Sequence, residues 1–207
     1  RSTLFPYTTL FRSRTGWLLA NKWPGYALPC FVSVYLFCFI AFFTSRYIDS
    51  KFDFPQAVVT KQQAFIKTIG NSSIPTEKLE PTAASFLKNI PQAITLSTIR
   101  PYPSDVHHLL SLAATIETDL ILLLFLLFLF FRKQTGTNAR NTFYFCTFFS
   151  ISLLLAIGFS VNNLGAIVRY RSIIIPLVIT IMAAQTDWKA IANLLYGKYK
   201  KKSATAI

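Results

Sequence analysis

Long apolar stretches dominate this chain and limit what it can fold into. Residues 26–44 contain no charged side chain, residues 120–131 are entirely apolar, and residues 142–161 again lack charge. A run of roughly 20 apolar residues crosses the hydrocarbon core of a bilayer as one helix. Charged residues make up only 14% of the 207-residue chain, against roughly 25% in soluble domains. We therefore expect an all-α membrane protein with about four transmembrane helices.

The net charge of +13 does not by itself indicate a nucleic-acid partner. The basic residues lie beside the apolar stretches, where anionic lipid and the positive-inside rule account for them. Cys30, Cys38 and Cys146 lie inside apolar stretches, without the spacing of a metal site or a redox pair. We expect membrane lipids as partners, and no nucleic acid, metal or cofactor.

The first residues have a different character from the rest. Residues 3–13, TLFPYTTLFRS, resemble a translated sequencing adapter. We therefore expect residues 1–13 to be a sequencing artefact. The remainder is then expected to be the C-terminal part of a longer membrane protein.

Lys and Arg counts in the short connecting segments predict the orientation of the spans, because cytoplasmic loops carry an excess of these residues. The segment 132–141 and the C-terminal tail are basic, so we expect both in the cytoplasm. Two short helices are expected in the external region. One covers residues 55–69, with Val58, Phe65, Ile66 and Ile69 on its apolar face. The other covers residues 81–90, with Ala83, Phe86, Leu87 and Ile90 on its apolar face. The expected organisation is a first transmembrane helix within 14–45, an external (periplasmic) loop with short amphipathic helices over 46–108, three further transmembrane helices over 109–186, and a basic cytoplasmic tail over 187–207.

Arg169 and Arg171 are the exception to this pattern, because they lie near the outer end of the last span. Two guanidinium groups can bind a phosphate or a carboxylate. On a continuous helix the two positions lie about 200° apart, so both reach one ligand only if the helix is broken. Pro176 permits such a break. Alternatively, one arginine extends to lipid phosphate and the other pairs with Glu117 or Asp119.

A second group of polar residues precedes the second span. Arg100 is followed by Pro101-Tyr102-Pro103, then by Ser104, Asp105 and His107-His108. Ser104 or Asp105 can cap the following helix, and a helix N-terminus beside Arg100 favours an anion. Asp105, His107 and the intramembrane Glu117 are candidates for a general acid or base. Interfacial polar residues with no chemical role are the alternative.

These two groups resemble short motifs in the C-terminal part of large bacterial inner-membrane proteins from surface-polysaccharide gene clusters. The first motif is R-P-(F/Y)-P followed by a helix with a Glu, and here it is Arg100-Pro101-Tyr102-Pro103 with Glu117. The second is N-x-G-x-x-x-R-x-R-x-x-x-x-P, and here it comprises Asn163, Gly165, Arg169, Arg171 and Pro176, with Tyr170 between the arginines. Ser104-Asp105 stands where that family often has an aromatic residue and an acid.

The resemblance implies a protein that handles polyprenyl-phosphate-linked glycans on the outer face of the bacterial inner membrane, as a polymerase, ligase or glycosyltransferase-like protein. The expected substrate-binding residues are Arg100, Tyr102, Asn163, Arg169, Tyr170 and Arg171, and the expected catalytic residues are Glu117, His107 and Asp105. The second hypothesis is a non-catalytic membrane protein, either a piece of a transporter or an assembly subunit, in which the arginines form structural pairs.

Overall fold

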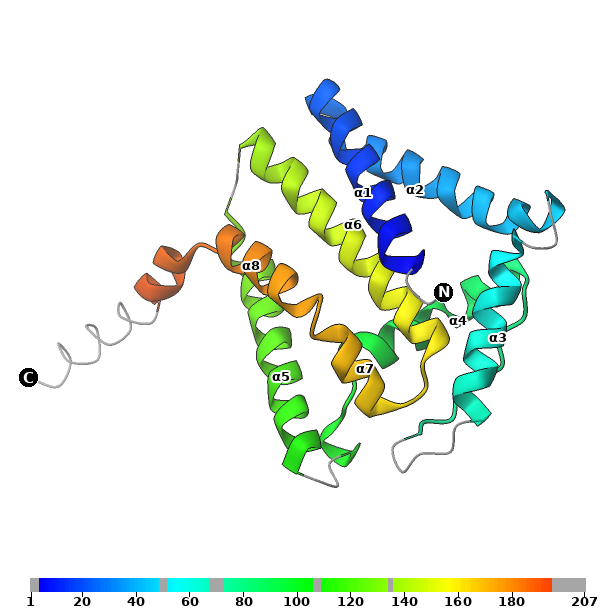
Figure 1. The fold of residues 1–207 in the computed structure, drawn as a ribbon. Helices are drawn as coiled ribbons and strands as arrows, with labels where there is room; N and C mark the ends of the chain where they lie inside the picture. Colours follow the sequence, from blue (N-terminus) through cyan, green and yellow to red (C-terminus); the bar gives the residue numbers. More distant parts are fainter. Residues whose placement is uncertain (1–3, 49–51, 68–72, 106–108, 134–135, 195–207) are drawn as a thin grey trace, which may run out of the picture.

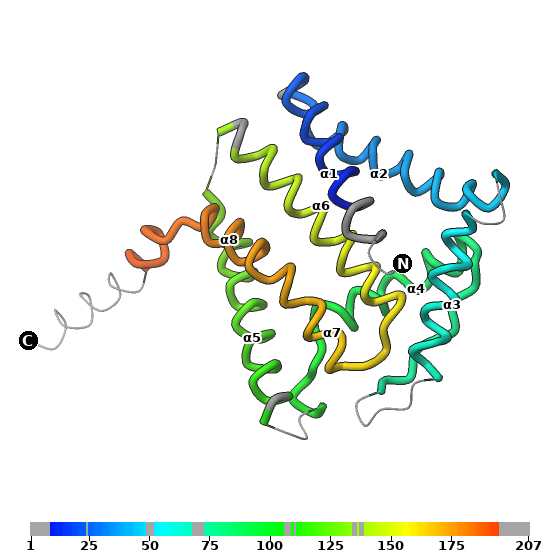
Figure 2. The backbone as a smooth tube through the Cα atoms, viewed as in Figure 1, coloured from blue at the N-terminus to red at the C-terminus, as the bar shows by residue number. Residues whose placement is uncertain are grey.

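The computed structural model describes residues 4–48, 52–67, 73–105, 109–133 and 136–194, and this part of the chain is helical, without a β-strand (Figures 1 and 2). The helices are α1 (Leu4–Lys22), α2 (Ala27–Thr44), α3 (Phe54–Lys67), α4 (Ala83–Ile94), α5 (Leu109–Phe130), α6 (Thr137–Ser160), α7 (Leu164–Arg171) and α8 (Ile175–Gln185). A π-helical turn, η4 (Thr95–Ile99), extends α4, and a 3-10 turn, η5 (Pro103–Asp105), precedes α5.

The expected all-α membrane architecture is confirmed. Within the described residues, Ala27–Tyr47, Ser111–Phe130 and Ala139–Ser160 are long and apolar enough to cross a membrane. Helices α7 and α8 together form a possible fourth span that is bent by 53°. The bend follows from Pro176 in the first turn of α8, because proline has no N–H to bond the Ser172 carbonyl.

Helix α1 packs between α2 and α6 (Figure 1). It includes residues 4–13, and in that segment Thr9 and Ser13 are buried. The Ser13 and Tyr35 hydroxyl groups are 2.6 Å apart, which joins α1 to α2. That residues 1–13 are a sequencing artefact stays a prediction. The region 14–45 is divided between two helices, because the chain turns at Pro24-Gly25 before α2 begins.

The expected external region contains two amphipathic helices, α3 and α4. The buried face of α4 differs from the predicted one: Asn89 and Ala93 are buried, whereas Leu87 is 54% exposed. The cause is a close approach of α6. A Cβ at Gly158 would overlap the backbone carbonyl of Ala93, so the absent side chain lets the two helices pack backbone to backbone.

Backbone hydrogen bonds define two opposite ends of this helical assembly. At one end the Ile74 N–H donates to the Asn162 carbonyl over 2.8 Å, which joins the α6–α7 turn to the segment before α4. At the other end the residues after α5 and after α8 pair through Arg132 and Thr186. Helix α5 and the α7–α8 pair therefore run in the same direction, and α6 runs back between these ends (Figure 1).

Candidate functional site

Helix α7 begins at a side-chain cap that follows directly from its sequence. The side-chain amide oxygen of Asn163, Oδ1, accepts hydrogen bonds from the backbone N–H groups of Gly165 (3.0 Å) and Ala166 (3.4 Å). Asparagine is among the preferred capping residues because its side chain accepts from these otherwise unpaired donors. The cap fixes where α7 starts, and thereby the positions of both arginines further along it.

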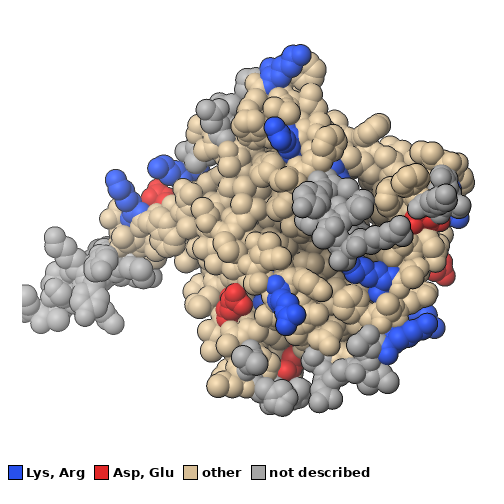
Figure 3. All heavy atoms as spheres, in the orientation of Figure 1, with Lys and Arg blue, Asp and Glu red and all other residues tan. Residues whose placement is uncertain are grey.

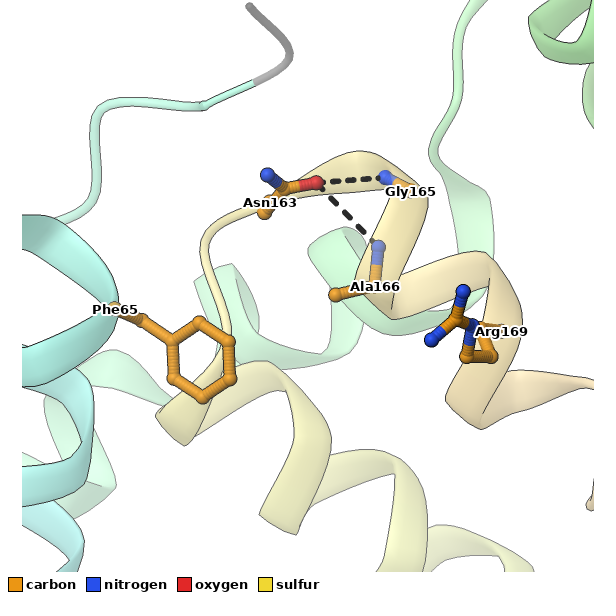
Figure 4. Close-up of a pocket in the computed structure, with 5 residues that line it drawn as sticks. All are labelled: Phe65, Asn163, Gly165, Ala166 and Arg169. Atoms are coloured by element: carbon orange, nitrogen blue, oxygen red, sulfur yellow. Dashed lines mark hydrogen bonds between the residues drawn. The ribbon is translucent and has the colours of Figure 1, made fainter. Parts of the chain in front are cut away.

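A pocket of about 340 Å³ lies beside this helix start, lined by Phe65, Asn163, Gly165, Ala166 and Arg169 (Figure 4). Phe65 comes from α3 and faces α7 across the pocket (Figure 4). Arg169 is exposed and contributes the cationic group. The pocket therefore combines an aromatic wall with a guanidinium group, at the end of the molecule where the Ile74–Asn162 hydrogen bond lies.

Arg171 lies on the opposite face of α7 and is only 4% exposed. Its Nη1 donates to the backbone carbonyls of Arg100 (2.9 Å) and Thr98 (3.4 Å), and its Nη2 donates to the Thr118 hydroxyl (2.8 Å). The guanidinium group therefore connects α7 to the end of η4 and to the middle of α5.

The residues that bind Arg171 explain why a charged group is buried there. A helix ends with carbonyl groups that lack intrahelical partners and with a partial negative charge. The chain becomes extended at Arg100, directly after η4, so the carbonyls of Thr98 and Arg100 lie at such an end. Arg171 supplies the missing donors, and its positive charge suits that helix terminus.

The side chain of Arg100 belongs to a separate local arrangement. Its guanidinium lies 3.8 Å from the Asp105 carboxylate and 5.1 Å from the centre of the Tyr102 ring. The same carboxylate accepts the Tyr102 backbone N–H over 3.0 Å. The side chain of Arg100 thus contacts those of Tyr102 and Asp105 within the turn before α5, and these contacts stabilise that turn.

The carboxylates of α5 differ in their surroundings. Glu117 is partly buried and is the acidic neighbour that acts electrostatically on Arg171, without a direct ion pair. Asp119 is exposed. His107, the third expected catalytic residue, lies outside the described residues, as does His108. In the part of the chain that the structure describes, no group of His, Cys, Asp and Glu side chains could hold a metal ion.

The three arginines of the two motifs therefore lie in different surroundings. Arg169 and Asn163 line the pocket, Arg171 is buried against Thr118, and the Arg100 side chain lies in the turn before α5. Tyr170, between the two α7 arginines, is 42% exposed. The structure does not bring the three guanidinium groups to one ligand, because positions 169 and 171 lie on opposite faces of a regular helix.

Two residues that matter here were not among the sequence-based candidates. Thr118 accepts from Arg171, and its place between Glu117 and Asp119 in an apolar span is a polar signal that could have indicated it. Phe65 was expected only on the apolar face of a helix over residues 55–69, and the packing of α3 is what brings it to the pocket.

Comparisons with known proteins identify no relative. No protein-family model, no curated protein and no solved structure matches this chain.

Proposed function

We propose that this chain is part of a bacterial inner-membrane protein that acts on polyprenyl-phosphate-linked glycans in envelope polysaccharide assembly. We further propose that its described residues bind the phosphate headgroup at Arg169. The observation that carries the proposal is the exposed guanidinium on the wall of a 340 Å³ pocket, at one end of the apolar helices. The motif resemblance of residues 100–176 supports the ligand class.

The pocket suits an amphiphilic anion. A guanidinium group binds phosphate through two parallel N–H donors, and it stays charged at all physiological pH values. The backbone donors of Gly165 and Ala166 are already bonded to Asn163, so Arg169 is the cationic donor that faces the pocket. Phe65 offers an apolar surface beside it for the hydrocarbon or sugar part of the ligand.

The proposed role is binding, because none of the expected catalytic carboxylates lines the pocket. Asp105 closes a turn, and Glu117 lies beside the buried Arg171. The burial of Arg171 among protein acceptors favours the second candidate, a non-catalytic membrane protein with structural arginines. The two candidates differ in what they predict for Arg169.

The variant Arg169→Ala tests the binding proposal. In the purified full chain, we expect it to weaken binding of a polyprenyl phosphate by about ten- to hundredfold, since a hydrogen bond to a charged group contributes about 1.5–3 kcal/mol. Binding of the corresponding polyprenol, which lacks the phosphate, should not change. Native mass spectrometry in detergent can measure both affinities.

The matched control is Lys88→Ala, which removes an exposed cation that pairs with Glu77 on the surface instead of lining the pocket. It should bind polyprenyl phosphate as the unchanged chain does. Equal binding by Arg169→Ala and the unchanged chain would reject the proposal and favour the second candidate.

The pocket must also face the periplasm for this role. In a background where Cys30, Cys38 and Cys146 are replaced, we expect Tyr170→Cys to react in intact cells with a maleimide that cannot cross the membrane, because Tyr170 is 42% exposed. Lys133→Cys, beyond the opposite end of α5, should react only after permeabilisation. The reverse labelling pattern would place the pocket in the cytoplasm and overturn the proposal.

A further inference from the structure

The end of the molecule opposite the pocket carries a basic surface that the proposed function does not use. The Lys133 N–H donates to the Gln185 carbonyl over 2.8 Å, and the Asp187 N–H donates to the Phe131 carbonyl over 2.7 Å. These bonds hold the residues after α5 beside those after α8 (Figure 1). Arg132, Lys133 and Lys189, all exposed, therefore come from two segments held at one end of the apolar helices.

Aromatic rings place the Arg132 guanidinium at the edge of the apolar region. Its central carbon lies 5.7 Å from the centre of the Phe128 ring in α5 and 5.0 Å from that of Phe143 in α6. Cation–π attraction favours this position, and the residue remains exposed. The charge is thus held where an acyl region meets a headgroup region.

The acidic residue in this segment does not neutralise the three cations. The Asp187 carboxylate accepts the backbone N–H groups of Lys189 and Ala190, each over 3.1 Å, and so caps the helical residues 188–194. Among the described residues no ion pair joins Asp187 to Arg132 or Lys133. Arg132, Lys133 and Lys189 outnumber this one carboxylate, so the surface keeps a net positive charge. Figure 3 shows broad uncharged areas between the separate groups of charged side chains.

Trp188 adds a feature typical of the membrane–water boundary. Its ring is 49% exposed, and its indole N–H donates to the Ala183 carbonyl over 2.8 Å. Tryptophan is enriched at the headgroup level of membranes because its ring is amphipathic. We therefore expect the basic surface to lie at the level of lipid headgroups.

We propose that Arg132, Lys133, Trp188 and Lys189 form a binding site for the phosphate headgroup of an anionic phospholipid in the adjacent leaflet. A lipid suits this surface better than a free anion, because the exposed Trp188 ring and the partly buried Phe143 ring provide contacts for its acyl and glycerol parts. This site is separate from the pocket at Arg169, which lies at the other end of the helices.

The double variant Arg132→Gln/Lys133→Gln tests this site in the purified full chain. We expect its affinity for phosphatidylglycerol to fall about 30-fold, since each basic residue near an anionic surface contributes about a fivefold preference. Phosphatidylcholine binding should be weak and unchanged. Native mass spectrometry of lipid adducts gives both values.

The matched control is Lys78→Gln/Lys88→Gln, which removes the same charge from exposed positions near α4. It should keep the phosphatidylglycerol affinity, and Arg169→Ala should keep it too. If the Arg132→Gln/Lys133→Gln variant and the control lose phosphatidylglycerol affinity equally, the attraction is general electrostatics, and the proposed site is overturned. Displacement of the lipid by millimolar inorganic phosphate would overturn the lipid assignment.

If the double variant fails to fold, a measurement on the unchanged chain still tests the proposal. Raising the ionic strength from 0.05 to 0.5 M shortens the Debye length several-fold, so phosphatidylglycerol binding should weaken while phosphatidylcholine binding stays constant. Phosphatidylglycerol binding that is unaffected by salt would also overturn the proposal.

Discussion

Replacing Arg171 by alanine is expected to lower the free energy of unfolding by about 2–5 kcal/mol, because each buried acceptor left without a donor costs about 1–3 kcal/mol. The carbonyls of Thr98 and Arg100 lose their side-chain donor, and α7 loses its connection to α5. Thermal or denaturant unfolding of the purified chain in detergent measures the change, and the yield of folded protein should fall with it.

The control for this experiment is the neighbouring arginine of the same helix. Arg169 is exposed, so Arg169→Ala should change the stability by no more than about 0.5 kcal/mol. Arg171→Lys should recover only part of the loss, because one ammonium group cannot reproduce the fork of a guanidinium. If Arg171→Ala and Arg169→Ala are equally stable, Arg171 does not hold the helices together as the structure indicates.

The second large effect is expected at Gly158. Gly158→Ala should destabilise the fold by about 1–3 kcal/mol, the usual cost of overpacking, because the new Cβ would overlap the backbone of Ala93. A backbone carbonyl cannot rotate away as a side chain can, so α4 must move from α6. The shift in unfolding midpoint measures this effect.

Gly25→Ala is the matched glycine control. A Cβ at Gly25 meets nothing within 4 Å, so this variant should be neutral. Alanine also reduces the conformational entropy of the unfolded chain, and this effect favours a slightly higher free energy of unfolding. Unchanged stability of Gly158→Ala would mean that α4 and α6 are further apart than the structure places them.

Hydropathy predicted the membrane-spanning helices well because the length of an apolar run is a local property. The spans in α2, α5 and α6 lie where the apolar stretches predict them, and the bend near Pro176 follows from the chemistry of one residue. The buried face of α4 was predicted less well. Leu87 is exposed and Asn89 is buried, since the fit of α4 against Gly158 sets the rotation of that helix.

Arg169 and Arg171 show the same difference between what the local sequence predicts and what packing decides. Helical geometry alone places Arg169 and Arg171 on opposite faces. It does not say which face meets the rest of the protein. That depends on the end of η4, where two carbonyls lack partners, and on Thr118 of the adjacent span.

Sequence alone determined that this is an all-α membrane protein and where its apolar spans lie, and it identified Pro176 as a residue that permits a break in the last span. These properties depend on neighbouring residues along one helix, so composition and spacing carry them. The sequence left open whether Arg169 and Arg171 reach one ligand. Only the tertiary structure decided that Arg171 is buried, that Arg169 and Phe65 share a pocket, and that the segments carrying Arg132 and Lys189 lie side by side. Such outcomes depend on contacts between residues far apart in the chain, which no local pattern records.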